Sequence, residues 1–91
     1  MRIRWSSHVE DKIAKELSKL GVTKDLLEEI VKVPDEVLYD SVSGRYVASK
    51  LKCNVAVIYE RDVEDMFIIT AIYSSKLDDV ILRRKRSGRW I

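Results

Sequence analysis

Residues that could act on a phosphodiester are spread along this chain of 91 residues. RNA can be cut without a metal because its own 2′-hydroxyl is the nucleophile. The protein then supplies a base, an acid and cations that stabilise the charge growing on the phosphate. Lysine, arginine, histidine and tyrosine suffice for these roles. The candidate catalytic residues are His8, Lys50, Lys52, Arg83 and Arg86, with Tyr73 as a further candidate acid.

A second group of side chains is suited to holding a nucleic acid. The last nine residues contain five bases and no acid, and a tryptophan among them adds a stacking platform to the cations. The candidate nucleic-acid-binding residues are Lys12, Arg61, Arg84, Arg89 and Trp90. Each group also has a structural alternative. The basic segment can be a solvated helix end, His8 can join the first strand to the first helix, and the two lysines can be solvated strand residues.

Other chemistries lack the residues that they require. A zinc site needs three or four ligands, and the chain has one histidine and one cysteine. The acidic residues at positions 60–65 lack the spacing and glycine of a calcium loop. The three glycines do not cluster into a phosphate loop, and no serine stands in a nucleophile-elbow context. We therefore expect neither a metal nor a cofactor, and Cys53 is interpreted as a half-buried thiol at a strand end.

The charge is small in total but uneven. The net charge is +2, yet residues 10–40 carry nine acids and five bases, whereas residues 41–91 carry ten bases and six acids. A basic half beside an acidic half favours a face for a polyanion. Charged residues make up 35% of the chain, which contains no glutamine and one asparagine, a composition that resembles hyperthermophile proteins.

The first third predicts two helices after a short strand at residues 2–5. Ser7 and Glu10 have capping-box spacing, and apolar residues recur at helical spacing up to Leu20, after which Gly21 can close the helix. Thr23 can cap a second helix, which Pro34 ends.

The remainder predicts strands. Residues 36–42 and 45–51 form a hairpin, and the apolar runs 54–59 and 66–73 form the two central strands. If the helices cover the face of Val47, Ser49 and Leu51, then Tyr46, Ala48, Lys50 and Lys52 share an open face. Residues 75–86 predict a short helix with a Ser75–Asp78 capping box, or alternatively a strand around positions 80–82. The fold class is α+β, a single domain over residues 1–91 with two N-terminal helices on a sheet of four or five mainly antiparallel strands.

Several motifs occur in an order that resembles a family of small proteins near the RelE/ParE toxin superfamily, which includes the BrnT-type toxins. They are Ser7-His8 with a base at Lys12, Gly21-Val22-Thr23, Val33 to Val37, Gly44-Arg45-Tyr46, and Val55 to Asp62 running on to Ile68–Tyr73. Together they span residues 5–73. Lys12 stands where the family usually has arginine, which keeps the charge but not the bidentate fork.

The resemblance implies a RelE-like fold and a role as the toxin of a type II toxin–antitoxin pair. Such a toxin cleaves RNA without metal and is neutralised by an antitoxin protein, so RNA and an antitoxin are the expected partners, with a homodimer as a further one. A non-catalytic nucleic-acid-binding module and a protein-interaction domain are the alternatives. No run reaches the ~18 apolar residues of a membrane span, so we expect a cytoplasmic chain without membrane contact.

Overall fold

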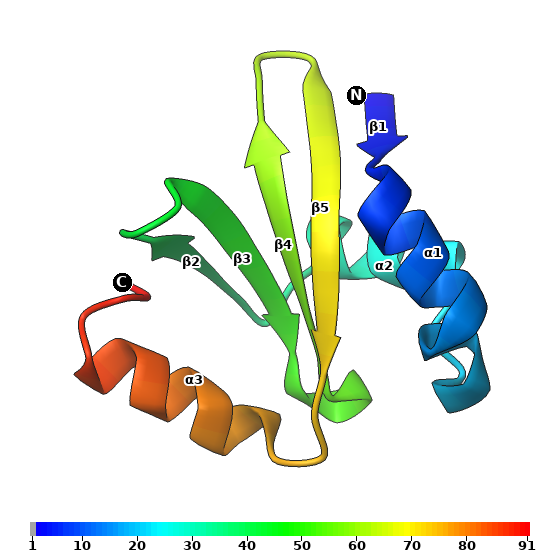
Figure 1. The fold of residues 1–91 in the computed structure, drawn as a ribbon. Coiled ribbons are helices and arrows are strands. Elements are labelled where there is room, and N and C mark those ends of the chain that lie inside the picture. Colours follow the sequence, from blue (N-terminus) through cyan, green and yellow to red (C-terminus); the bar gives the residue numbers. More distant parts are fainter. Residues whose placement is uncertain (1) are drawn as a thin grey trace.

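The computed structural model describes residues 2–91, which form a compact α+β fold of three α-helices on one five-stranded mixed sheet (Figure 1). The strands are β1 (Arg2–Trp5), β2 (Glu36–Asp40), β3 (Arg45–Lys50), β4 (Val55–Arg61) and β5 (Asp65–Tyr73). The helices are α1 (Ser7–Lys15), α2 (Lys24–Lys32) and α3 (Leu77–Arg86), with short 3-10 turns at Leu17–Leu20 and Leu51–Cys53. Within residues 2–91 no helix is long and apolar enough to cross a membrane.

The sheet order is β1-β5-β4-β3-β2, so both strands of the central apolar hairpin lie inside the sheet. The four strands from β2 to β5 pair in an antiparallel meander, whereas β1 pairs in parallel with β5. The sheet is therefore mainly antiparallel, as expected, with one parallel pair between β1 and β5. That pair arises because α1 and α2 lie between β1 and the meander, which starts at the far edge of the sheet.

The predicted helix starts agree with the structure to within a residue or two. Ser6, not Ser7, caps α1, since its Oγ accepts the amide of Val9 at 3.0 Å. The helix ends earlier than expected, at Lys15, and a 3-10 turn completes the segment up to Gly21, whose φ of 77° is the left-handed conformation that favours glycine. Thr23 caps α2 as predicted.

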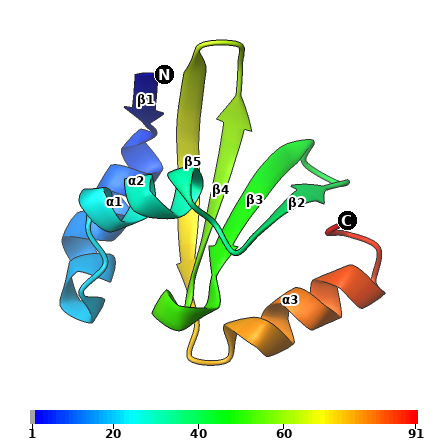
Figure 2. The same ribbon diagram turned by 180° about the vertical axis from the view of Figure 1, so that it is seen from behind.

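Helices cover both faces of the sheet, which creates two cores (Figures 1 and 2). The helices α1 and α2 lie on one face, over the larger core that includes Val9, Leu27, Val57 and Ile68. Helix α3 and the C-terminal tail lie on the opposite face, at the β2–β3 side of the sheet. This second core contains Leu38, Val47, Ala56, Leu77, Ile81 and Trp90.

The prediction that β3 has an open face is wrong. Ala48 is completely buried in the core beneath α1 and α2, and Lys50 Nζ lies 3.8 Å from Glu29 Oε1 of α2. Val47 instead faces the second core. Because the adjacent residues Val47 and Ala48 are both apolar, alternation along this strand does not identify which face the N-terminal helices cover. Lys52 is not in the strand at all but in the 3-10 turn after it.

The C-terminal segment is a helix, as the first of the two alternatives predicted, followed by a docked tail. Helix α3 begins at Leu77 without a side-chain cap, so the predicted Ser75–Asp78 capping box does not form. After Gly88 the tail runs antiparallel to β2: the amide of Ile91 donates to Tyr39 O at 2.9 Å, and the amide of Tyr39 donates to Ile91 O at 3.1 Å. The tail thereby covers part of an edge strand that would otherwise be open.

Candidate nucleic-acid interface

Helix α3 separates its charges along its length. Asp78 and Asp79 occupy its first turn, and Arg83, Arg84, Lys85 and Arg86 occupy its last. Each sign lies at the end of the helix dipole that it complements, so the arrangement stabilises the helix as well as making its end basic. Of these four bases, only Lys85 has an acidic partner within 4.0 Å among residues 2–91, namely Glu36.

Three unpaired cations surround an open hollow on α3. Lys76, Arg83 and Arg86 line it together with the hydroxyls of Ser74 and Ser75, and the hollow has a volume of about 590 Å³. In the described part of the chain, none of these three cations forms an ion pair. Asp79 is the single acidic side chain in the lining. Cations and hydroxyl donors around a concave surface suit a phosphate group.

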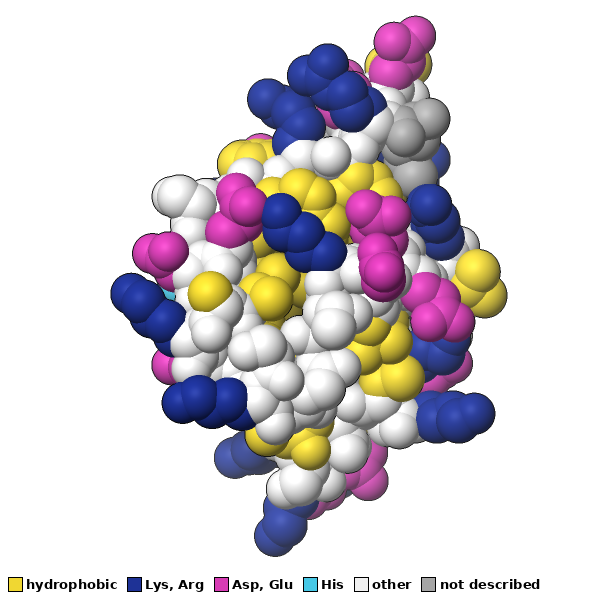
Figure 3. All heavy atoms as spheres, turned by 90° about the vertical axis from the view of Figure 1, so that its right-hand side faces the viewer, with side chains coloured by type: hydrophobic (Ala, Val, Ile, Leu, Met, Phe, Trp, Pro, Cys, Tyr) yellow, Lys and Arg dark blue, Asp and Glu magenta, His cyan; other side chains and the backbone are white. Residues whose placement is uncertain are grey.

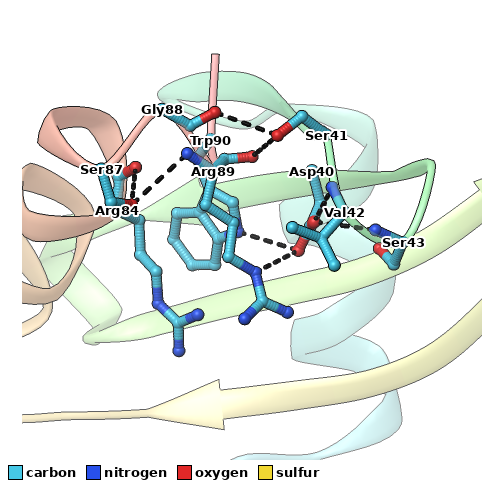
Figure 4. A network of polar contacts seen from close by, with 9 residues as sticks. All are labelled: Asp40, Ser41, Val42, Ser43, Arg84, Ser87, Gly88, Arg89 and Trp90. Atoms are coloured by element: carbon cyan, nitrogen blue, oxygen red, sulfur yellow. Dashed lines mark hydrogen bonds and ion pairs between the residues drawn. The ribbon is translucent and has the colours of Figure 1, made fainter.

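Two further arginines extend from the end of the helix and from the tail (Figure 4). The Arg84 guanidinium carbon lies 5.4 Å from the centroid of the Trp90 ring, within the range of a cation–π contact. Arg89 Nε donates to Asp40 Oδ2 at 3.2 Å. In the view of Figure 4 both guanidinium groups extend in the same direction, away from the backbone of the tail. Neither arginine lines the hollow itself.

Trp90 is not the exposed stacking platform that the sequence predicted, since 2% of its surface is exposed. Its indole fills the second core and its Nε1 donates to Asp40 Oδ2 at 3.1 Å. A tail of mostly basic residues is typical of a solvated segment, but one large apolar ring can bury enough area to dock it. Trp90 therefore positions Arg84 and Arg89 and does not contact a ligand itself.

Asp40 is the buried centre of the contacts that hold the tail (Figure 4). Its Oδ1 accepts the amides of Val42 and Ser43 at 2.9 and 3.0 Å, while its Oδ2 accepts Trp90 Nε1 and Arg89 Nε. Burial by itself raises the pKa of the carboxyl. The hydrogen bonds from Ser43, Val42, Trp90 and Arg89 outweigh burial and lower the pKa from 3.8 to about 2.

Because of this shifted pKa, the free energy of unfolding depends on pH in the acidic range. The lowered pKa means that folding favours the ionised form of Asp40. The resulting stabilisation is complete above about pH 4 and is lost as the pH falls through about 2. At about 1.4 kcal/mol per pH unit the contribution is about 2 kcal/mol. We expect urea unfolding to show wild type more stable than Asp40→Asn by roughly this amount near neutral pH, with the difference disappearing near pH 2. A constant difference would contradict the assignment.

None of the other candidate residues lines the hollow. His8 and Lys12 are on α1, beside the free edge of β5: His8 Nε2 is 3.2 Å from Thr70 Oγ1, and Lys12 Nζ donates to Ala71 O at 2.7 Å. Since β1 ends at Trp5, the contact from Lys12 satisfies one backbone carbonyl on the edge of β5 that β1 does not pair. Figure 3, which views the molecule from the side where α1 and α2 lie in Figure 1, shows acidic and basic side chains interspersed.

The lysines and the hairpin arginine are also separate. Lys50 pairs with Glu29 of α2, and Lys52 lies exposed in the 3-10 turn. Arg61 lines a hollow of about 300 Å³ at the β4–β5 hairpin, together with the acidic residues Glu60, Asp62 and Asp65. Tyr73 is 37% exposed at the end of β5. The structure therefore brings Arg83 and Arg86 together in the hollow and places Arg84 and Arg89 at the docked tail, whereas His8, Lys50 and Lys52 do not line the hollow.

Sequence reasoning missed Lys76, Ser74 and Ser75 in the hollow, and it missed Asp40 as the centre of the contacts that hold the tail. Lys76 lies directly before α3 and about two helical turns before Arg83. This spacing was the signal in the sequence that could have identified it. Asp40 gave no signal, because an acid at the end of a predicted strand is usually solvated. Comparisons of the chain with protein-family models, curated proteins and solved structures found no significant match.

Proposed function

We propose that the chain binds RNA, with Lys76, Arg83 and Arg86 contacting phosphates at the hollow on α3. The observation that supports this proposal is the convergence of three unpaired cations and two serine hydroxyls on one open concave surface. Phosphate contacts of this kind supply most of the affinity of sequence-independent binding. Arg84 and Arg89, whose guanidinium groups point the same way, lengthen the basic surface for a strand that continues past the hollow.

Binding of this kind depends steeply on salt. Each phosphate contact to a single strand contributes about −0.7 to the slope of log K against log salt, so three contacts predict a slope of about −2. We expect a fluorescein-labelled single-stranded RNA to show this slope in anisotropy titrations with KCl. No binding at about 50 mM KCl, or an affinity independent of salt, would refute phosphate recognition.

The finer proposal is a RelE-like toxin that also cleaves the RNA that it binds. Its support is the resemblance carried by residues 5–73, together with the two N-terminal helices on one face of the sheet that this resemblance implies. Arg83 and Arg86 would stabilise charge on the phosphate, and Asp79 is the carboxylate placed to accept a proton in the same hollow. A protein antitoxin would be the natural partner of such an enzyme.

Cleavage is distinguished from binding by its products. A metal-independent mechanism predicts cutting in EDTA with 2′,3′-cyclic phosphate ends. It also predicts loss of cutting, with binding retained, in Asp79→Asn. Because His8 and Lys50 lie elsewhere, His8→Ala is the matched control and should cut at the wild-type rate. If neither free nor ribosome-bound RNA is cut, the cleavage proposal is wrong and only the proposed binding role remains.

A further inference from the structure

A second concave surface lies between α3 and the adjoining ends of β2 and β3. It is a groove of about 320 Å³ whose apolar lining comes from Leu51, Ile81 and Leu82. Leu51 and Leu82 are each 46% exposed, so leucine side chains from two separate segments meet water in one groove. This volume lies near the lower end of the range of about 300–1,000 Å³ for ligand pockets, and it suits one or two inserted side chains.

The rim of this groove is acidic, in contrast to the basic hollow on the same helix. Asp35, Glu36, Asp78 and Asp79 line it, against a single base, Lys85. One oxygen of Asp35 accepts the amide of Leu51 and one oxygen of Asp78 accepts the amide of Asp79. In the part of the chain that the structure describes, no cationic side chain lies within 4.0 Å of Asp35, Asp78 or Asp79.

Lys85 demonstrates how a cation is held at this rim. It lines the groove, and its Nζ lies 2.8 Å from Glu36 Oε2. Lysine and arginine commonly pack their aliphatic stems on apolar surface and place the charged head in a polar environment. The remaining carboxylates and the exposed leucines offer the same combination to side chains from outside the chain.

We propose that this groove docks a basic segment of a partner protein. An inserted lysine or arginine packs its stem on Leu51 and Leu82 and places its head between Asp35 and Asp78, and neighbouring apolar residues of the segment cover the rest of the leucine surface. Charge complementarity selects this occupant. A polyanion is repelled by four carboxylates, and a neutral apolar segment would strip water from them without compensation.

The test uses a fluorescein-labelled peptide of about eight residues in which leucine alternates with lysine or arginine. We expect it to bind the full chain in anisotropy titrations and to shift the amide resonances of the groove residues. A peptide with glutamate in place of each base should not bind. The double variant Leu51→Ala/Asp78→Asn is expected to weaken the affinity at least tenfold, whereas Asp11→Asn/Leu20→Ala, which removes an exposed acid and an exposed leucine elsewhere, should leave it unchanged.

Three outcomes overturn the docking proposal. The first is the absence of binding. The second is equal binding by the groove variant and its control, which would indicate non-specific attraction to acidic side chains elsewhere on the protein. The third is movement of the groove resonances with protein concentration alone, which would place a second copy of the chain in the groove. RNA binding should be retained in Leu51→Ala/Asp78→Asn, so failure here is distinguishable from failure of the RNA proposal.

Discussion

Replacing Trp90 by alanine is expected to lower the free energy of unfolding by about 3–5 kcal/mol, the usual cost of removing a buried aromatic side chain. The indole is the largest buried side chain among residues 2–91, and it belongs to the second core together with Leu38 and Ile81. The total free energy of unfolding of a domain of this size is about 5–15 kcal/mol. The variant should therefore be marginally folded at 25 °C, which urea denaturation followed by circular dichroism would measure.

A second variant separates the ring from its hydrogen bond. Trp90→Phe keeps an aromatic ring in the core but removes the Nε1 donor to Asp40 Oδ2, which then retains Arg89 as its partner. We expect this change to cost about 1–3 kcal/mol, the penalty for leaving a buried polar group partly unsatisfied. If Trp90→Ala costs less than about 1 kcal/mol, then the tail is not docked in solution.

The sequence predicted the elements better than it predicted which faces they cover. Thr23 and Gly21 have strong local preferences, and their positions at the start of α2 and after the 3-10 turn follow from those preferences. The interior placement of β4 and β5 followed equally well from two nearly uncharged runs. Local chemistry decides these features, and so a single sequence suffices for them.

The face of β3 and the position of Trp90 depend on contacts across the chain. Val47 and Ala48 are both buried because α3 and its tail cover the face opposite α1 and α2, which the spacing within β3 does not encode. Trp90 meets Asp40 across 50 residues of sequence. The wrong face of β3 explains why Lys50, which was predicted to lie near Arg83, instead pairs with Glu29 of α2.

The basic residues on α3 give the sharpest functional prediction. Reversing the charge of two of them, Arg83→Glu/Arg86→Glu, should weaken RNA binding at least a hundredfold. A hydrogen bond to a charged group is worth about 1.5 kcal/mol or more. The loss of two such bonds therefore costs about 3 kcal/mol, which corresponds to about a hundredfold increase in Kd. Both side chains are exposed and unpaired, so the chain should stay folded, although acids at the C-terminal end of the α3 dipole should cost roughly 1–2 kcal/mol of stability. The salt slope should also become less steep by about 1.4, as two phosphate contacts are removed.

The matched control makes the same change of net charge on another surface. Lys15, at the end of α1, and Lys19, in the 3-10 turn after it, are exposed, and Lys15→Glu/Lys19→Glu alters the net charge by the same amount. Long-range attraction alone would weaken RNA binding similarly in both double variants. Direct contact at the hollow predicts a large loss for the α3 variant and less than about a threefold loss for the control at about 150 mM salt, where the Debye length is about 8 Å. Equal losses would mean that RNA responds to the overall charge of the protein, and the hollow would then have no specific role.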